Sequence, residues 1–231
     1  MNTRTRDRAI FLDFDHTLFD TDEFFHMDVR TSFRHLGLDS ASWEQGYARA
    51  WRAGYSLEGH AEEMYRQSGS PRALEDMKRI LRESFMDLQR YLFSDVLPFL
   101  GAARERGVRL YLLSRGDPGW QRYKVAGSGI ESYFNGTFFT AHEGGKANVI
   151  LEQAGSCQKV VMVDNNPSEL DLIKEATPDI ATYCINRVPR ESVVPADETS
   201  RLRFLEARDY ATRPWRYQHV PCRTLDEVGT S

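Results

Sequence analysis

The sequence has few cysteines and no long apolar run, and neither sign of charge dominates it. Its three cysteines are an odd number without the spacing of a metal site, so we expect reduced thiols and a cytoplasmic location. No run of about 18 apolar residues is present, which excludes an ordinary membrane-spanning helix. The N-terminus is basic, but Asp13 and Asp15 interrupt the apolar run that follows, so we expect no targeting segment and no membrane partner.

The charge balance argues against nucleic acid as the main partner. The chain has 30 basic and 34 acidic residues and a net charge of -4, whereas nucleic-acid binding needs a concentrated basic face. Hydrophobic residues make up 41% of the 231 residues and aromatic residues 12%, enough for a buried core. This length and composition indicate a globular protein of one large domain or two modest ones.

Short apolar runs that stop at charged or turn residues predict a parallel β-sheet. The runs are near-continuous rather than alternating, as in strands that are covered on both faces. Helical stretches that begin at proline or end at glycine separate them. Strands that alternate with helices indicate an α/β fold with a Rossmann-like core. The five runs are 9–12, 108–113, 136–140, 159–163 and 180–185.

One long segment departs from this alternation. Residues 20–92 contain no convincing strand and predict helices separated by glycine and proline. We therefore expect a helical module inserted after the first strand, and a discontinuous core made of residues 1–19 and 93–231. Residues 187–216 are polar and contain three prolines, which indicates a surface excursion before a last strand and short helix within 220–228. The four helices of the module are expected at 21–36, 40–53, 57–68 and 71–93.

Two aspartates follow the first predicted strand. Because side chains alternate along a strand, Asp13 and Asp15 begin on the same side of it. They stand at the carboxyl end of a parallel strand, where open α/β sheets bind ligands. Two close carboxylates repel each other, and a divalent cation such as Mg²⁺ would relieve that repulsion. The pair alone leaves a simpler interpretation open, in which one aspartate caps a turn and the other faces solvent.

Three further polar residues occupy the same edge of the predicted sheet. Ser114 ends the second strand, and its hydroxyl and the amides of Arg115 and Gly116 could hold anionic oxygens. Lys146 opens a helix, where a cation opposes the helix dipole, so its position requires an anionic partner. Asp164 ends the fourth strand. Each alone is an ordinary turn or surface residue, but together they can converge on one metal ion and one phosphate.

These residues, in this order, resemble the motifs of the haloacid dehalogenase superfamily. Asp13-Phe14-Asp15-His16-Thr17 is similar to its first motif, Ser114 to its second, Lys146 to its third and Asp164 to its fourth. The resemblance covers about residues 8–186. The helical insertion resembles the cap of the family, so the resemblance implies a Rossmann-like core with an inserted α-helical cap.

The resemblance implies a Mg²⁺-dependent phosphatase that acts on a small phosphate ester. Asp13 would attack phosphorus and form an aspartyl-phosphate, while Asp15 would protonate the leaving oxygen and then activate water. The metal would be held by the carboxylates of Asp13 and Asp164 and by the backbone carbonyl of Asp15. Family members that cleave carbon–halogen bonds lack an acid at the position of Asp15, which favours phosphate chemistry. The groups implied to bind phosphate are the side chains of Ser114 and Lys146 and the backbone amides of Phe14 and Arg115.

The fourth motif departs from the usual family pattern. A second carboxylate usually follows four or five residues after the first, and here those positions hold Ser168 and Glu169. Glu169 could act through water and Asn165 could supply another oxygen, so the completion of the metal shell stays open. Lys124 is the only rival of Lys146 for the lysine role, and its place before an apolar helix predicts a surface residue.

The cap would choose the substrate through its polar and aromatic residues. Tyr47 lies four residues from a tryptophan on either side, and this spacing is also typical of core packing. His16, in the first motif, could touch a ligand or only pack. The candidates in the cap are His26, Arg30, Trp43, Tyr47, Trp51, Arg52 and Tyr55.

Two other functions remain open at this point. One is a phosphomutase of the same superfamily, whose cap would shield the phospho-enzyme from water. The other is a non-enzymatic binding protein that has kept the fold. The sequence leaves open the identity of the ester, the oligomeric state and the role of residues 187–216.

Overall fold

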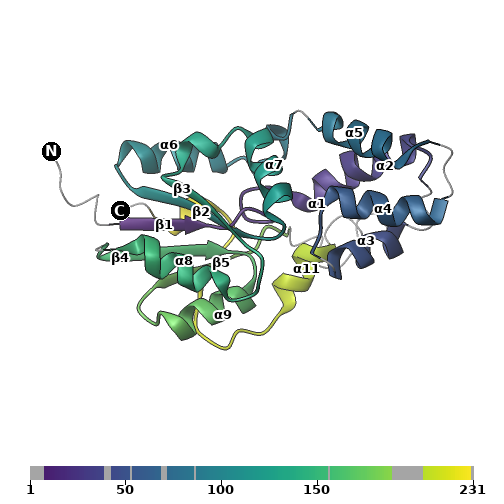
Figure 1. Ribbon diagram of the computed structural model, residues 1–231. Helices are drawn as coiled ribbons and strands as arrows, with labels where there is room; N and C mark the ends of the chain where they lie inside the picture. The colour runs from purple at the N-terminus through teal and green to yellow at the C-terminus, as the bar shows by residue number, and fades with distance from the viewer. Residues whose placement is uncertain are drawn as a thin grey trace.

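A single sheet of six parallel strands organises the molecule (Figure 1). The computed structural model describes residues 8–38, 43–52, 54–68, 72–85, 87–155, 157–188 and 205–229. The strand order is β3-β2-β1-β4-β5-β6, the order of doubly wound dinucleotide-binding folds. The strands are β1 (Arg8–Leu12), β2 (Arg109–Arg115), β3 (Gly136–Thr140), β4 (Lys159–Asp164), β5 (Ala181–Ile185) and β6 (Val220–Cys222).

Strand β1 lies at the centre of the sheet and positions the candidate site. It pairs with β2 on one edge and β4 on the other, and all five of its residues are buried. The chain fills one side of β1 with β2 and β3 and then crosses to the other side for β4. This reversal of direction opens a crevice at the carboxyl end of β1, where such folds bind ligands. The predicted α/β fold with a Rossmann-like core is therefore confirmed.

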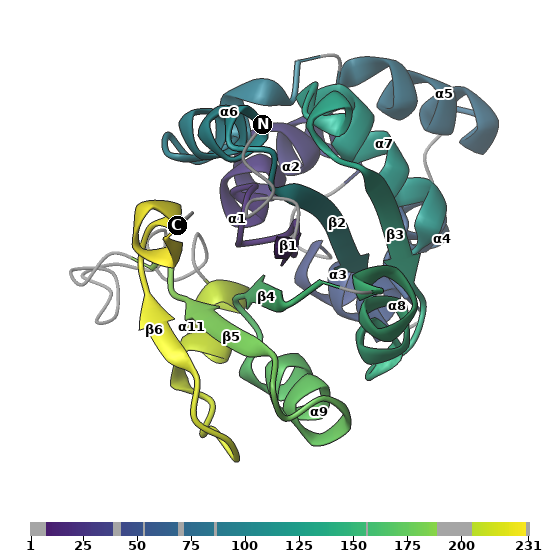
Figure 2. The ribbon, with the colours of Figure 1, turned by 90° about the vertical axis from the view of Figure 1, so that its left-hand side faces the viewer.

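Helices cover both faces of the sheet (Figure 2). Ile10 and Leu12 belong to the apolar cluster that includes residues of α6 and α7, whereas Ala9 and Phe11 join a second cluster with residues of α8 and α9. Neighbours in β1 thus serve opposite faces, which explains why residues 9–12 of this strand are all apolar. These helices are α6 (Val96–Glu105), α7 (Pro118–Ser128), α8 (Gly145–Ala154) and α9 (Pro167–Ala176).

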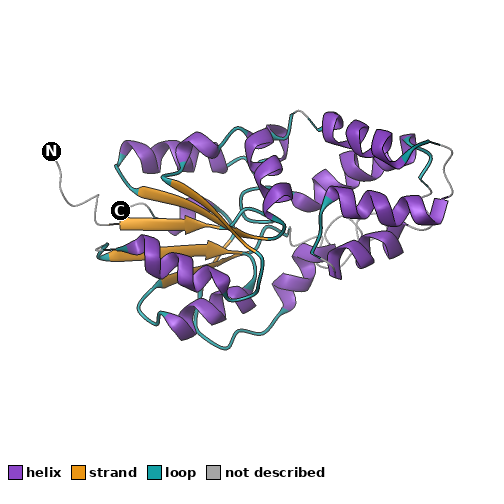
Figure 3. Cartoon of the chain, viewed as in Figure 1, coloured by secondary structure: helices purple, strands orange, loops and turns teal. Residues whose placement is uncertain are grey.

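Most of the described residues between β1 and α6 lie in helices. Figure 3 shows this helical group beyond the carboxyl ends of the strands. We call residues 21–84 the helical module. In the described part of the chain, no helix is long and apolar enough to cross a membrane. The module contains α1 (Thr21–Phe24), the π-helical turn η2 (Phe25–Val29), α2 (Arg30–His35), α3 (Trp43–Arg52), α4 (Leu57–Ser68) and α5 (Leu74–Ser84).

The helix expected at 71–93 is wrong beyond Ser84. The next residue, Phe85, leaves the helical conformation with φ -113° and ψ 68°, and the short turn η4 (Gln89–Tyr91) follows. Leu88 is fully buried against Gly127 of α7, where an added Cβ would lie 2.9 Å from Leu88 Cδ1. The helix ends because burial of Leu88 in the core outweighs the local preference for helix.

In its described part, the chain after β5 returns to the sheet through a helix that precedes the last strand. That helix, α11 (Leu205–Thr212), lies beside the helical module in Figure 1 and contacts α1. The predicted last strand and short helix are confirmed as β6 and the turn η7 (Leu225–Val228). Of the predicted excursion at 187–216, residues 189–204 lie outside the described residues.

Candidate active site

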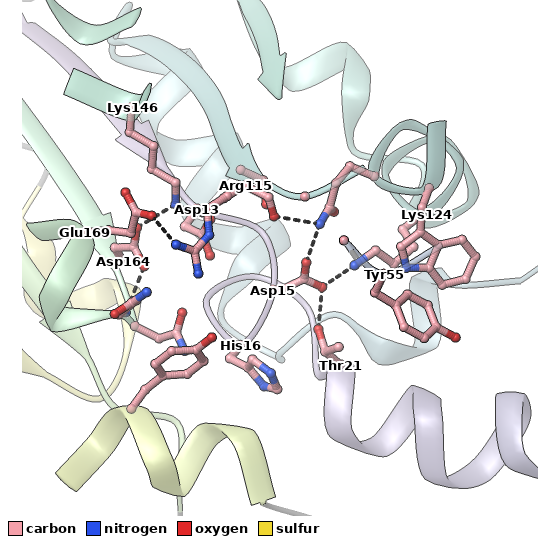
Figure 4. Close-up of a pocket in the computed structure, with 18 of the residues that line it drawn as sticks. Asp13, Asp15, His16, Thr21, Tyr55, Arg115, Lys124, Lys146, Asp164 and Glu169 are labelled. Atoms are coloured by element: carbon pink, nitrogen blue, oxygen red, sulfur yellow. Dashed lines mark hydrogen bonds and ion pairs between the residues drawn. The ribbon is translucent and has the colours of Figure 1, made fainter. Parts of the chain in front are cut away.

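A cavity of about 260 Å³ lies at the carboxyl ends of β1, β2 and β4 (Figure 4). Core loops, the helical module and α11 all contribute to its walls. Phe14 is absent from them because its ring is buried and stacked on Phe19, with centroids 4.9 Å apart. The cavity brings together the other predicted site residues, namely Asp13, Asp15, Ser114, Arg115, Lys146 and Asp164.

Lys146 bridges two buried carboxylates. Its Nζ donates to Asp13 Oδ1 at 2.6 Å and to Asp164 Oδ2 at 2.7 Å. Lys146 reaches them from the first turn of α8, and Gly144 enters that helix with a left-handed φ of 78°. Asp13 directly follows β1, Asp164 ends β4 and Lys146 lies in α8, so the crossovers of the fold assemble this cluster.

The cluster carries more negative than positive charge. Burial raises the pKa of Asp13 to about 7; the Lys146 ammonium opposes this shift and the Asp164 carboxylate adds to it. Burial also raises the pKa of Asp164, against the effect of Lys146. Burial disfavours the Lys146 ammonium, but the two carboxylates outweigh it and raise its pKa. Two carboxylates with one ammonium carry a net negative charge, which a further cation would neutralise.

Asp15 turns away from this cluster toward α7 and the start of α1 (Figure 4). Its carboxylate accepts hydrogen bonds from Lys124 Nζ, from Thr21 Oγ1 at 2.6 Å and from Gln121 Nε2 at 2.7 Å. Burial alone would raise the pKa of Asp15, but these donors, Lys124 first, outweigh it and lower the pKa. Asp15 is therefore held as an anion in this arrangement.

The surface position expected for Lys124 is wrong. Lys124 is 1% exposed, and its ammonium lies 5.4 Å from the centre of the Phe14 ring and 5.7 Å from that of Trp120. Helix α7 starts at Pro118, where the Asp117 side chain accepts the amide of Trp120 at 2.7 Å. That start sets the phase of the helix and directs Lys124 inward.

Glu169 is engaged by the protein itself. It is 1% exposed, and its carboxylate accepts from Arg115 Nη1 at 2.8 Å and from the Gly144 amide at 3.3 Å. Burial disfavours the Arg115 guanidinium, but Glu169 outweighs that effect and raises the pKa of Arg115. Glu169 thus orients Arg115 at the cavity and ties the loop before α8 to α9.

Three buried polar atoms at the cavity find no hydrogen-bond partner within the described part of the chain. They are Ser114 Oγ, Gln121 Oε1 and Asn165 Nδ2. All three residues line the cavity, and buried polar groups are normally paired. These atoms are available to a polar ligand.

Aromatic side chains form the wall that the helical module contributes. Phe25 packs against Tyr55 and Tyr47, with ring centroids 4.9 and 5.5 Å apart, and Trp120 of α7 continues this surface. Of the candidates in the cap, Tyr47 and Tyr55 line the cavity. Trp43 packs instead on Phe33, with Arg30 above its ring. The side chains of His26, Trp51 and Arg52 lie outside the described residues.

Sequence reasoning missed several residues of the cavity and placed Lys124 at the surface. Gln121 and Lys124 stand three residues apart on α7, and the Asp117-Pro118 helix start was the signal for their common face. Thr21 follows a helix-capping aspartate, Asp20, but nothing local directs it to Asp15. Tyr210 belongs to the polar excursion and carries no sequence signal for the site. The missed residues that the site or its walls use are Thr21, Phe25, Trp120, Gln121 and Tyr210.

Comparisons with known proteins agree with this architecture. A phosphoserine phosphatase from Thermus thermophilus is 28% identical over 128 residues, or 52% of this chain, and the chain spans about half of that relative, 50%. A haloacid dehalogenase-like hydrolase from Burkholderia xenovorans LB400 aligns with TM-score 0.65 and 21% identity over 96% of this chain and 97% of the other. An L-2-haloacid dehalogenase from Xanthobacter autotrophicus aligns with TM-score 0.60 and 15% identity over 95% and 96%.

At these identities the two structural relatives show the fold alone. The match to a family model is more specific, because it spans residues 8–177 and so includes Asp13, Lys146 and Asp164, which form the buried cluster. The chain belongs to the haloacid dehalogenase-like hydrolase family.

Proposed function

We propose that this hydrolase is a Mg²⁺-dependent phosphatase that cleaves a small phosphate monoester through an aspartyl-phosphate on Asp13. The observation that carries the proposal is the buried cluster of Asp13, Lys146 and Asp164, with a second carboxylate, Asp15, two residues after the first. The similarity to a phosphoserine phosphatase supports phosphate chemistry. In this proposal the helical module serves as the cap over the site.

The cluster fits a hard divalent cation. The described residues contain no group of three or more histidine, cysteine, aspartate or glutamate side chains that could hold a metal. Mg²⁺ commonly takes one or two carboxylates and keeps several waters, so the carboxylates of Asp13 and Asp164 with the Asp15 carbonyl would suffice. A bound Mg²⁺ would lower the repulsion between the Asp13 carboxylate and the incoming phosphate.

Asp13 supplies the nucleophile in the first step. One of its carboxylate oxygens bonds to phosphorus while the bond from phosphorus to the leaving oxygen breaks, which yields the aspartyl-phosphate. Lys146 and Ser114 Oγ donate to the phosphoryl oxygens as negative charge moves onto them. The hydroxyl of Ser114 supports this assignment, because it has no hydrogen-bond partner in the described protein that it would lose on binding phosphate.

Asp15 acts as a general acid in the first step and as a general base in the second. In the first step a protonated Asp15 transfers its proton to the leaving oxygen. In the second step the Asp15 anion takes a proton from the water that attacks the aspartyl-phosphate, which frees Asp13 and inorganic phosphate. The low pKa of Asp15 favours the anion and therefore suits the second step. A leaving group that is already acidic needs the first proton transfer less.

The test is phosphate release from a panel of monoesters by wild-type protein and by Asp13→Asn. Wild-type activity should disappear with a chelator and return with Mg²⁺, because two anions must meet at one phosphorus. Asp13→Asn should fold and release no phosphate, since an amide is a poor nucleophile. Asp226→Asn, an exposed substitution far along the chain in η7, is the matched control and should keep wild-type turnover. Activity in excess chelator, or turnover by Asp13→Asn, would contradict the proposal.

A further inference from the structure

Tyr210 brings the segment after β5 to the cavity. It borders both the site cavity and an adjoining cavity of about 280 Å³, and His16 and Asn165 border both as well. The Tyr210 ring lies 6.3 Å from the His16 imidazole, with 54° between their planes. Figure 4 shows α11 running past the loop that carries His16. Two aromatic rings from distant parts of the chain therefore share one wall.

His16 holds an unfavourable backbone conformation to occupy that wall. Its φ is 56°, and it is the one non-glycine residue with positive φ in the described part of the chain. Glycine would adopt this conformation without the steric cost of a Cβ. Such outliers collect at ligand sites, where the side chain has a use. The imidazole is 4% exposed, and its Nδ1 lies 3.6 Å from the Asp22 carboxylate, so its position is well defined.

A buried polar cluster anchors the chain that follows Tyr210. Asp171 of α9 accepts the backbone amides of Arg216 and Tyr217 at 3.0 and 2.9 Å. Its carboxylate also lies 3.2 Å from His219 Nε2, and His219 Nδ1 lies 2.8 Å from Thr182 Oγ1. The side chains of Asp171, Thr182 and His219 are all nearly inaccessible. The C-terminal end of α11 is thereby fixed to the core, and Tyr210 with it.

The wall that the helical module contributes indicates what kind of group fits beside His16 and Tyr210. Among the described residues of the helical module that line the cavity, none is charged; they are Thr21, Phe25, Tyr47, Gly54 and Tyr55. Each lysine or arginine among the described lining residues is paired with a carboxylate: Lys124 with Asp15, Lys146 with Asp13 and Asp164, and Arg115 with Glu169. In the proposed function Lys146 serves the phosphoryl group, and Arg115 and Lys124 each already neutralise one carboxylate, so the described lining residues offer no unpaired lysine or arginine for a second anionic group on the substrate.

From these observations we propose that His16 and Tyr210 hold an uncharged aromatic leaving group against the aromatic wall of the helical module. The segment after β5 is thus a specificity element of the site, besides the module itself. The identity of the substrate as a phosphate ester rests on the proposed function, whereas the aromatic subsite does not. Phosphoserine, whose leaving group carries an ammonium and a carboxylate, is expected to be a poor ligand.

The experiment measures binding by calorimetry, in the presence of Mg²⁺, of two phosphonates that cannot be hydrolysed. Benzylphosphonate reaches the aromatic subsite and methylphosphonate does not. Tyr210→Ala should weaken benzylphosphonate by about 2- to 10-fold, the range that aromatic contacts provide, and leave methylphosphonate unchanged. Tyr210→Phe should bind benzylphosphonate as tightly as the wild type does, because it keeps the ring that makes the contact. His16→Gly should also weaken benzylphosphonate selectively while relaxing the backbone.

Tyr217→Ala is the matched control, because Tyr217 lies on the same anchored segment, is 41% exposed and lines neither cavity. It should bind both phosphonates as the wild type does. Equal losses of both phosphonates in Tyr210→Ala, or no loss of either, would overturn the inference. So would a wild-type protein that binds the two equally or binds neither. If the protein bound benzylphosphonate selectively but hydrolysed no ester, the proposed function would be contradicted. The aromatic subsite would still be supported.

Discussion

Replacing His60 with glutamine should remove a large part of the acid sensitivity of this protein. His60 is fully buried in the helical module, with its ring 4.5 Å from that of Trp43 and 4.7 Å from that of Phe33. Its Nδ1 lies 3.1 Å from the hydroxyl of Tyr55, and its Nε2 has no hydrogen-bond partner within the described part of the chain. Burial lowers the pKa of His60 to about 3.

The sign and the size of the effect follow from this pKa. In the unfolded chain histidine titrates near 6.5, so below that pH the unfolded state binds a proton that the folded state excludes. The contribution of His60 to stability is complete above pH 6.5 and is lost as the pH falls from 6.5 toward 3. The loss approaches about 1.4 kcal/mol per pH unit and reaches about 2 kcal/mol at pH 5. Total stabilities are commonly about 5–15 kcal/mol, so this loss is measurable.

The assay is urea unfolding at pH 7.5 and pH 5 for the wild type and His60→Gln. The drop in unfolding free energy between the two pH values should be smaller in His60→Gln by about 2 kcal/mol. Any loss of stability that His60→Gln causes equally at both pH values cancels when the two unfolding free energies are subtracted. His35→Gln, which removes an exposed histidine of α2, should keep the wild-type drop. Equal drops in wild type and His60→Gln would refute the reasoning.

Two further predictions concern the proton chemistry at Asp15. Asp15→Asn should reduce single-turnover cleavage of an alkyl phosphate by about 10²–10⁴-fold and of an aryl phosphate by less, because an acidic phenol needs little protonation. Trapped aspartyl-phosphate should accumulate with the aryl ester, and equal losses without an intermediate would mean that Asp15 only shapes the loop. Lys124→Met should raise the pKa of Asp15, since the main group that lowers it is gone. The acidic limb of the pH–rate profile should then move to higher pH, and an unchanged limb would show that Asp15 does not control it.

The sheet and the main polar cluster could be predicted because their signals are local. Each buried strand is a short apolar run, and the carboxyl ends of parallel strands meet at one edge. Asp13 and Asp164 stand directly after such runs, and Lys146 opens the helix that follows β3. Their convergence on one point needs only the strand order, which the alternation of strands and helices already constrains. Because β1 and β4 are neighbours in that order, Lys146 can form hydrogen bonds with both Asp13 and Asp164.

The elements that were predicted wrongly or missed depend on distant contacts. Helix α5 ends early because Leu88 is needed against Gly127, a residue almost 40 positions away in the chain. Lys124 is buried because α7 begins at Pro118 and packs across Phe14. Tyr210 reaches the cavity because the segment after it is fastened to Asp171. No short window of sequence contains both partners of any of these contacts.

The contrast between Asp13 and Asp15 shows how little their spacing decides about their chemistry. The alternation of a strand places both on one side, yet burial beside Asp164 raises the pKa of Asp13 to about 7, while the pKa of Asp15 is lowered. Burial disfavours both anions, but Asp13 shares the Lys146 ammonium with Asp164, whereas Asp15 accepts from Lys124 of a separate helix and from two further donors. Two acids whose surroundings shift their pKa values in opposite directions are suited to different steps of one reaction. A metal ion bound to Asp13 would offset the negative charge of this carboxylate as it attacks phosphorus. Asp15 is anionic without a metal ion and can accept a proton from the attacking water.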